Sequence, residues 1–235
     1  MSELVLSAGY MGLAEKFEGT SLVVYIDPAG IPTVGIGHRV KVGEEKIYLG
    51  GMSIAQAVSM ARTNKDEFLR RTAKLSLEQV HALKNHDMDD AIKAVLKRLA
   101  AWGLKPKDVP QRCLEVLVDL AFNGGPGFLD GTIAKHMKAK NFDAAILFSP
   151  MFCLAEDENS PLKKKPLVPF TGLTLRRYSF VWYYFTGETW RIGESSKTRW
   201  NEVADFLAKL TALLAKRNLK NPLPYPNNRR EAQKY

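Results

Sequence analysis

The sequence has few cysteines, few histidines and no long apolar run. Its only cysteines, Cys113 and Cys153, lie far apart and form no CxxC motif, so we expect two reduced thiols and no disulfide framework. The four histidines show no i,i+4 pairing, and we therefore predict neither a metal site nor a cofactor. No apolar run reaches the length of about eighteen residues that a membrane-spanning helix requires.

The N-terminal residues Met-Ser-Glu lack the basic region of a secretory signal, so we expect synthesis in a cytoplasm. Hydrophobic residues make up 46% of the chain, which predicts a folded core rather than global disorder. The net charge is +9, and residues 191–235 contribute +6 of it through ten Lys/Arg and four Asp/Glu. This balance suggests an anionic partner, such as a nucleic acid, a phospholipid surface or an acidic cell wall, although solubility alone would also explain it.

The periodicity of apolar residues predicts a mixed fold with one small β region. Apolar positions from Leu6 to Phe17 follow one helix face, and Gly19 marks its end. Residues 21–27 and 32–38 read as a hairpin around an Asp-Pro-Ala-Gly turn, with a third strand expected near residues 46–49. Ser53 and Ser76 each suit a helix N-cap. We predict helices at about 53–69, 76–102, 111–122, 132–140, 143–148, 171–185 and 203–214, and a polar surface loop at 156–169.

Three residues in the first part of the chain suggest glycoside hydrolysis. Eight residues separate Glu18, at the predicted helix end, from Asp27 in the hairpin turn, and five more separate Asp27 from Thr33. Glycosidases use two carboxyl groups, one to protonate the leaving oxygen and one to manage a water or the oxocarbenium charge. A Glu before a Gly or an Asp before a Pro is ordinarily structural, so the spacing of the three residues carries the hypothesis.

Glu18 suits the acid role. The partial negative charge at a helix C-terminus disfavours a carboxylate, and burial against Phe17 and Tyr25 would act in the same direction. Both effects would keep the carboxyl protonated nearer neutral pH, where a general acid is useful. Asp27, in a polar turn, is expected to stay ionised.

The motifs resemble those of the phage-type lysozymes of glycoside hydrolase family 24, which include the T-even and lambdoid phage enzymes. The chain has Phe-Glu-Gly at residues 17–19, Tyr-Ile-Asp at 25–27 and Thr-Val-Gly-Ile-Gly-His at 33–38. Later segments are similar in order, namely Phe-Asn-Gly-Gly at 122–125, Gly-Leu-Thr-Leu-Arg-Arg at 172–177 and Thr-Gly-Glu-Thr-Trp at 186–190. The resemblance covers residues 1 to about 190 and is strongest over the first forty.

The resemblance implies a lysozyme-like α+β fold, with a small hairpin lobe after an N-terminal helix, a larger helical lobe and a cleft between them. The expected catalytic domain spans 1–190, with lobes at about 20–50 and 52–190, followed by a basic helical extension at 191–235. Glu18 is then the general acid, and Asp27 and Thr33 position and activate a water. Phe122 matches a substrate-binding position, and Arg176 or Arg177 is expected to pair with Glu18 in the resting site.

The chain departs from the family pattern at several places. Arg39 replaces an apolar residue after His38, Gly131 replaces a serine, and Phe180 stands where a Glu often follows the Arg pair. Residues 50–75 look like an extra helical segment. His38 is expected to hold the hairpin to the helical lobe rather than to take part in chemistry. T-even members invert the anomeric configuration, which suggests inversion here.

The leading hypothesis is therefore an endolysin-type muramidase that cuts the β-1,4 bond between N-acetylmuramic acid and N-acetylglucosamine in peptidoglycan and causes lysis. We expect a monomer that acts in the periplasm or cell wall and depends on a holin or a delivery machine. A secreted antibacterial effector is a variant of this hypothesis. A non-catalytic wall-binding module would not need the Glu-Asp-Thr set. A nucleic-acid binder is disfavoured because no recognisable module appears, whereas the basic tail suits transient contact with an anionic membrane.

Overall fold

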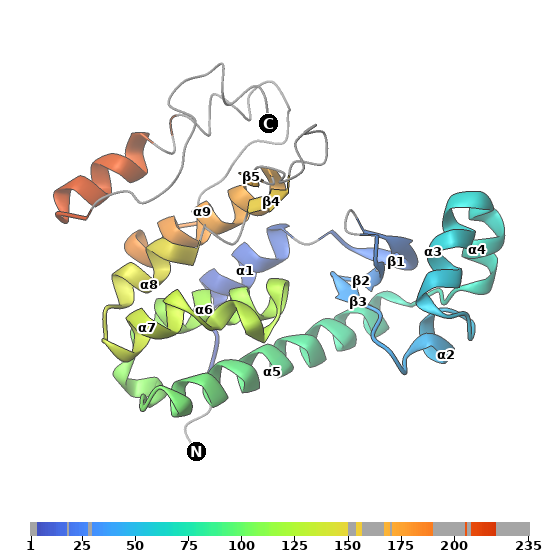
Figure 1. The fold of residues 1–235 in the computed structure, drawn as a ribbon, viewed down its shortest axis with the longest axis horizontal. Helices are drawn as coiled ribbons and strands as arrows, with labels where there is room; N and C mark the ends of the chain where they lie inside the picture. The colour runs from blue at the N-terminus through green and yellow to red at the C-terminus, as the bar shows by residue number, and fades with distance from the viewer. Residues whose placement is uncertain are drawn as a thin grey trace. The chain divides into compact units, whose positions relative to one another are not determined.

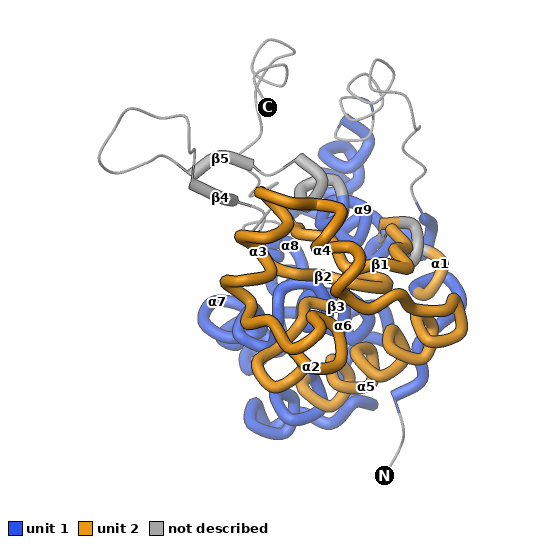
Figure 2. The backbone as a smooth tube through the Cα atoms, turned by 90° about the vertical axis from the view of Figure 1, so that its right-hand side faces the viewer, with its two compact units in different colours: residues 1–10, 95–235 blue, residues 11–94 orange. Residues whose placement is uncertain are grey.

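The computed structural model describes residues 4–17, 19–27, 30–149, 154–156, 167–169, 171–189, 205 and 208–219. The chain forms two compact units (Figure 2): unit 1 comprises residues 1–10 and 95–235, and unit 2 comprises residues 11–94. The boundaries fall within two helices, α1 (Ala8–Phe17) and α5 (Leu77–Ala101). In the part of the chain that the structure describes, no helix combines the length and hydrophobicity needed to cross a bilayer.

Unit 2 contains a three-stranded antiparallel sheet in the order β1-β2-β3. The strands are β1 (Ser21–Ile26), β2 (Pro32–Gly35) and β3 (His38–Arg39). Tyr25 pairs with Thr33, which in turn pairs with Arg39. Gly35 and Gly37 have φ values of +67° and +77°. These left-handed conformations suit glycine and reverse the chain between β2 and β3.

The prediction of a third strand near residues 46–49 was therefore wrong. The third strand is β3, and residues Glu45–Tyr48 form the short helix α2. The sequence pattern predicts one returning strand over residues 32–38, with two glycines inside it. The two glycines at positive φ instead divide that stretch into two strands, and the third strand ends before the segment that contains α2.

The extra segment after Gly50 forms two helices, α3 (Ile54–Thr63) and α4 (Lys65–Arg71). Ser53 caps α3 as predicted, because its hydroxyl accepts from the Gln56 amide while the Gln56 side chain accepts from the Ser53 amide. The expected single helix to Leu69 is broken at Asn64, whose backbone is extended and whose side chain caps α4 by accepting from the Glu67 amide.

The extra segment is part of the core of unit 2. Helix α3 packs on β1 and β2, and α3 packs on α4 (Figure 1). Apolar side chains from the strands and from these helices share one buried cluster, formed by Val24, Val34, Val40, Leu49, Met52, Ala57 and Phe68. Burial of this kind contributes about 25 cal/mol per Å² of apolar surface, so the segment stabilises the sheet. The sheet that leads to the turn is thus packed on one side by these helices.

Helix α5 is one continuous helix of 25 residues. It begins at the predicted capping box, in which the Gln79 amide donates to the Ser76 hydroxyl and the Ser76 amide donates to the Gln79 side chain. The first part of α5, up to Ala94, belongs to unit 2 and carries Asp87.

Unit 1 is built around α6 (Gln111–Gly124), whose residues 113–121 are all buried. Helix α6 packs against α8 (Phe142–Phe148), α9 (Thr171–Thr186) and the 3₁₀ turn η2 (Pro126–Leu129), while α7 (Thr132–Lys138) packs on α8. A further 3₁₀ turn, η1 (Pro106–Asp108), precedes α6. Two acidic residues, Glu115 and Asp119, lie on the buried surface of α6 and are discussed below.

Two regions of unit 1 differ from or extend the sequence expectations. The predicted loop at 156–169 is bordered by the short antiparallel strands β4 (Leu154–Glu156) and β5 (Leu167–Pro169), and its residues 157–166 lie outside the described part of the chain. Within the basic tail, residues 208–216 are helical, and Leu210 and Leu214 are fully buried. Arg217 donates from Nη2 to the carbonyl of Phe185 at 3.2 Å. Part of the tail is thus packed into unit 1.

Candidate active site

Asp27 directly follows β1 and is held by three hydrogen bonds to backbone groups of Gly30 and Ile31. Its amide donates to the Ile31 carbonyl at 2.9 Å, its carbonyl accepts from the Gly30 amide at 2.8 Å, and its Oδ1 accepts from the Ile31 amide at 2.9 Å. Gly30 has φ +78°, which suits this tight reversal. The sequence expected a polar turn at this position, and the structure places Asp27 in one.

The second oxygen of the Asp27 carboxylate binds Arg39. Arg39 Nε donates to Asp27 Oδ2 at 3.0 Å, and the Asp27 side chain is 10% exposed whereas that of Arg39 is 54% exposed. Sequence reasoning noted Arg39 only as a departure from the family pattern and missed this pair. The signal that would have found it is the strand register, which places Arg39 beside Thr33 and hence close to the turn.

Thr33 lies on β2 and is 2% exposed. Its hydroxyl donates to the Ile31 carbonyl at 3.0 Å. A hydroxyl has one proton and two acceptor lone pairs, so a Thr33 hydroxyl engaged in this way remains available only as an acceptor. Asp27 and Thr33 both bind Ile31, and the structure therefore brings these two predicted site residues together on one turn.

Glu18, the third residue of the predicted set, lies outside the residues that the structure describes. Helix α1 ends at Phe17, and the described chain continues at Gly19 and Thr20 before β1. The predicted helix end therefore agrees with the structure, while the role of Glu18 stays a prediction.

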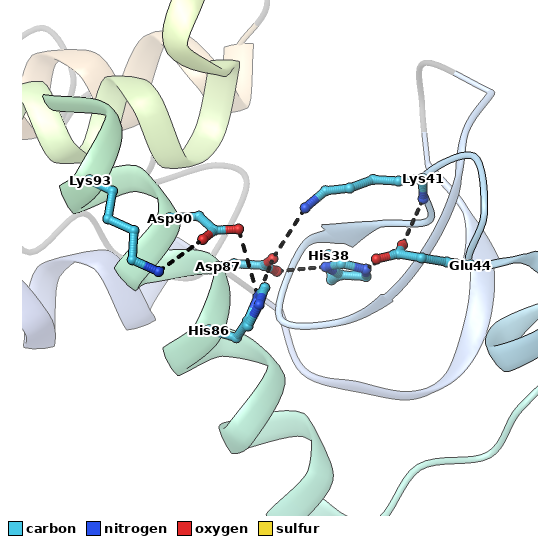
Figure 3. A network of polar contacts seen from close by, with 7 residues as sticks. All are labelled: His38, Lys41, Glu44, His86, Asp87, Asp90 and Lys93. Atoms are coloured by element: carbon cyan, nitrogen blue, oxygen red, sulfur yellow. Dashed lines mark hydrogen bonds and ion pairs between the residues drawn. The ribbon is translucent and has the colours of Figure 1, made fainter. Parts of the chain in front are cut away.

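His38 links the sheet to α5 within unit 2 (Figure 3). Its Nδ1 lies 2.7 Å from Asp87 Oδ2, and its Nε2 lies 3.0 Å from Glu44 Oε2. Burial lowers the pKa of His38, but the hydrogen bonds and charges of Asp87 and Glu44 outweigh burial and raise the pKa above its usual value. Because both ring nitrogens face carboxylates, the arrangement suits the imidazolium, which donates twice. His38 therefore has the structural role predicted for it.

The predicted arginines of α9 lie in a buried cluster of unit 1. Arg176 donates from Nε and Nη2 to Asp119 Oδ1, and Arg177 donates from Nη1 to Asp119 Oδ2 and from Nη2 to Asn123 Oδ1. All three charged side chains are almost completely buried. Sequence reasoning missed Asp119, although an acidic residue within a strongly apolar helix is itself a signal for a buried ionic partner.

Two further residues of unit 1, one apolar and one acidic, bear on the site. Phe122, the predicted substrate contact, is half-buried near the end of α6. Glu115 is fully buried, with Oε1 accepting from the Ser7 amide at 2.8 Å and Oε2 accepting from the Tyr183 hydroxyl at 2.7 Å. Burial raises the pKa of Tyr183, and the hydrogen bond to Glu115 acts in the same direction. This second cluster anchors the N-terminal segment on α6 and α9.

A metal site was not expected, and the described residues hold no group of three or more His, Cys, Asp or Glu side chains arranged to bind a metal ion. The chemistry of the described site is that of a fixed carboxylate beside a hydroxyl acceptor. Such a pair is suited to orienting a water molecule for attack on an electrophilic carbon.

The small antiparallel sheet and the mainly helical remainder define a lysozyme-like α+β fold. The model of the phage lysozyme family matches residues 15–179, a span that contains the helix end, the hairpin and α9 as far as the arginine pair. The chain therefore belongs to the phage lysozyme family, and it is a glycoside hydrolase that degrades peptidoglycan.

Individual relatives agree with this assignment. The endolysin of Salmonella phage P22 is 28% identical over 134 residues, which cover 56% of this chain and 71% of that protein. In structure, the chain is similar to an endolysin from Escherichia coli O157:H7 phage FAHEc1 (TM-score 0.50, 23% identity, 80% of this chain and 97% of that one). It is also similar to the active form of the P1 phage endolysin Lyz (TM-score 0.51, 20% identity, 79% and 87%). These two structural likenesses support the lysozyme-like fold.

Proposed function

We propose that the chain is an endolysin-type muramidase that hydrolyses the β-1,4 bond between N-acetylmuramic acid and N-acetylglucosamine. Glu18 is the general acid that protonates the leaving oxygen, and Asp27 and Thr33 orient and activate the attacking water. The observation that carries the proposal is the Asp27 carboxylate, which is fixed by Arg39 and by the amide of Ile31, the residue whose carbonyl accepts from the Thr33 hydroxyl.

The resemblance to inverting family members leads us to assign Asp27 the activation of water, and its contacts are compatible with that role. Both carboxylate oxygens already accept a hydrogen bond, one from the Ile31 amide and one from Arg39. These two charge-assisted hydrogen bonds fix the orientation of the carboxylate. It can still accept a proton from a water on its remaining lone pairs, which is the base role of an inverting glycosidase.

Thr33 complements Asp27. Its proton is directed to the Ile31 carbonyl, so a water that approaches Thr33 must donate a hydrogen bond to Oγ1. A water that donates to both Thr33 and Asp27 has its oxygen lone pair directed away from both residues, toward a sugar carbon. The two residues thus supply orientation and proton acceptance at one place.

Other residues complete the proposal. Glu18 lies within the span matched by the phage lysozyme family model, and its helix-end position suits a carboxyl that stays protonated. We propose Phe122 as a substrate contact, and Arg176 or Arg177 as the resting partner of Glu18. An arginine partner would favour the carboxylate form of Glu18 and so oppose the effect of the helix end.

The biological setting is also part of the proposal. We infer synthesis in the host bacterial cytoplasm, action on periplasmic or wall peptidoglycan as a monomer, and access through a holin or a delivery machine. We further propose a catalytic body at 1–190 and a basic extension at 191–235 that makes transient contact with anionic membranes. Its charge of +6 supports this contact. Because Leu210 and Leu214 are buried, truncation after Leu219 tests the contact without removing the packed helix.

Muropeptide mapping tests the chemistry. Purified peptidoglycan is digested with wild type, Glu18→Gln and the control Glu78→Gln, which alters an exposed residue of α5. We expect new reducing muramic acid ends from wild type and from the control, and a loss of roughly a hundredfold or more in Glu18→Gln. Equal activity of Glu18→Gln and wild type would overturn the role of Glu18, and new reducing ends on glucosamine would overturn the muramidase assignment.

A further inference from the structure

Two exposed arginines from different elements flank the hairpin turn that carries Asp27. Arg39, on β3, binds the Asp27 carboxylate at the first residue of the turn. Arg62, on α3, approaches the fourth residue, because a Cβ atom placed on Gly30 would lie 4.0 Å from Arg62 Nη2. The Gly30 amide donates to the Asp27 carbonyl at 2.8 Å. A turn closed in this way brings its first and fourth residues within about 7 Å of each other.

Arg39 uses only part of its hydrogen-bonding capacity. A guanidinium has five N–H donors, and Asp27 takes the one on Nε. Among the residues that the structure describes, neither terminal nitrogen of Arg39 has a hydrogen-bond or ion-pair partner, and 54% of the side chain is exposed. Within the described residues, four donors of this guanidinium are therefore without a partner, while its position is fixed by the Asp27 carboxylate.

Arg62 has no partner at all among the described residues. Its side chain is exposed, and within the described ranges it makes neither a hydrogen bond nor an ion pair. It belongs to the extra segment, whose core packing on β1 and β2 fixes α3 against the sheet. The segment thus brings a second guanidinium to the turn that holds Asp27.

The charges at the turn do not balance. Among the residues that the structure describes, two guanidinium groups lie at the turn with one carboxylate, that of Asp27, which Arg39 already engages. Arginine forks match the geometry of carboxylates and bind them through paired hydrogen bonds. The turn is therefore an unsatisfied anion site immediately beside the residue proposed to activate water.

We propose that Arg39 and Arg62 form a subsite for a carboxylate of the glycan substrate, so that the enzyme prefers charged strands over neutral ones. This inference rests on the proposed muramidase function. Muramic acid supplies the chemistry in two ways, either through the acidic peptide attached to its lactyl group or, when that peptide is absent, through the lactyl carboxylate itself. Arg39 holds Asp27 with one nitrogen and the substrate anion with the others, and Arg62 adds the second fork.

The test compares three glycans: intact peptidoglycan, strands stripped of peptide by an amidase, and stripped strands whose carboxylates are blocked as neutral amides with a carbodiimide and ethanolamine. The readout is the ratio of kcat/KM on each charged glycan to that on the neutral one. In Arg62→Gln we expect this ratio to fall about two- to fivefold, as for loss of an exposed ion pair, mainly through KM. Lys65→Gln, which removes one exposed positive charge from the same segment, keeps the wild-type ratio.

The pattern over the glycans identifies the source of the carboxylate. A lower kcat/KM ratio on intact peptidoglycan alone assigns the carboxylate to the peptide, and a lower ratio on stripped strands assigns it to the lactyl group.

Arg39→Lys, which keeps the charge, is expected to retain more of the ratio than Arg39→Gln. Unchanged ratios in Arg62→Gln, or an equal change in Lys65→Gln, would overturn the inference while leaving the muramidase assignment intact. Failure of the proposed function itself would instead appear as no cleavage of any glycan by wild type.

Discussion

The two units each contain an aspartate bound by arginine, and the two sites differ in exposure. In unit 2, Asp27 binds one arginine that is half exposed to solvent. In unit 1, Asp119 is completely buried and binds both Arg176 and Arg177, which are 4% and 1% exposed. The same pair of residue types therefore serves two purposes, because the surroundings decide what each pair contributes.

The energetics of the two sites explain the difference. An exposed ion pair contributes only about 0–1 kcal/mol to stability, because water screens the charges. Removing one partner of a buried pair costs about 3–5 kcal/mol, because the remaining charge is left without compensation in a low dielectric. Asp119 thus fixes α6 against α9, whereas the ion pair of Asp27 has an arginine that water reaches and is expected to contribute less to stability. We attribute the position of Asp27 to the proposed chemistry.

Asp27→Asn tests whether Asp27 acts in chemistry rather than in stability, and it should have the largest effect on activity. We expect kcat on peptidoglycan to fall by roughly a hundred- to ten-thousandfold, because the amide cannot accept the proton of the attacking water. The free energy of unfolding should change by less than about 1 kcal/mol. Turnover and urea unfolding measured on the same preparation check both parts.

Asp130→Asn is the matched control for Asp27→Asn. Asp130 Oδ2 accepts from Arg98 Nη2 at 2.8 Å in an exposed ion pair of unit 1. The control should keep wild-type turnover. An Asp27→Asn enzyme that turns over at the control's rate would contradict the assigned role.

Asp119→Ala tests the buried site. We expect a loss of about 3–5 kcal/mol in the free energy of unfolding, because two buried guanidinium groups lose their shared acceptor. Asp130→Ala should cost less than about 1 kcal/mol, since its partner is reached by water. Urea denaturation of both variants provides the measurement, and equal losses would remove the distinction between the two sites.

His38→Asn tests the carboxylate contacts that tie the sheet to α5. The pKa of His38 is raised in the folded state, so its contribution to stability is fully present below the unfolded value of about 6.5 and disappears as pH rises through the folded pKa. Hydrogen bonds to charged groups are worth about 1.5–3 kcal/mol. The stability difference between wild type and variant should therefore be largest near pH 5.5 and shrink at alkaline pH. A difference that grows with pH would show that the imidazolium is not the stabilising form.

Arg39→Gln should have the smallest effect on stability. Because Arg39 is exposed, loss of its contact with Asp27 is expected to change the free energy of unfolding by less than about 1 kcal/mol. The same variant should still lose activity on charged glycans relative to neutral ones, since it removes a guanidinium proposed to bind the substrate carboxylate. Thermal or urea unfolding beside turnover separates the two effects. A large loss in the free energy of unfolding would show that the Arg39–Asp27 pair stabilises the fold, as the pairs of Asp119 do.

Local rules predicted the helix caps at Ser53 and Ser76 and the turn at Asp27, while the chemistry of that turn stays a prediction. The capping boxes at Ser53 and Ser76 depend on residues three apart, so the sequence shows them directly. Asp27 and Thr33 were found through spacing and through resemblance to a family. The division of residues 32–39 into two strands was missed, because it depends on positive φ at two glycines within a stretch that otherwise reads as one strand.

Long-range ionic partners could not be predicted in the same way. Arg39 reaches Asp27 only through the register of β2 and β3, and Asp119 meets its arginines across more than fifty residues. The break at Asn64 also depends on packing, because α4 turns back on α3 rather than extending it. Side-chain partners set by tertiary structure have no fixed spacing in the sequence.

The central claim is that Asp27, held by Ile31 and Arg39 beside Thr33, activates a water rather than attacking the sugar. The most direct test is proton NMR of the reducing muramic acid formed in the first moments of hydrolysis, before the anomers equilibrate. Attack by water on a β-linked sugar predicts that the α-anomer appears first, with inversion. First appearance of the β-anomer would require a covalent or equivalent double displacement and would contradict the account.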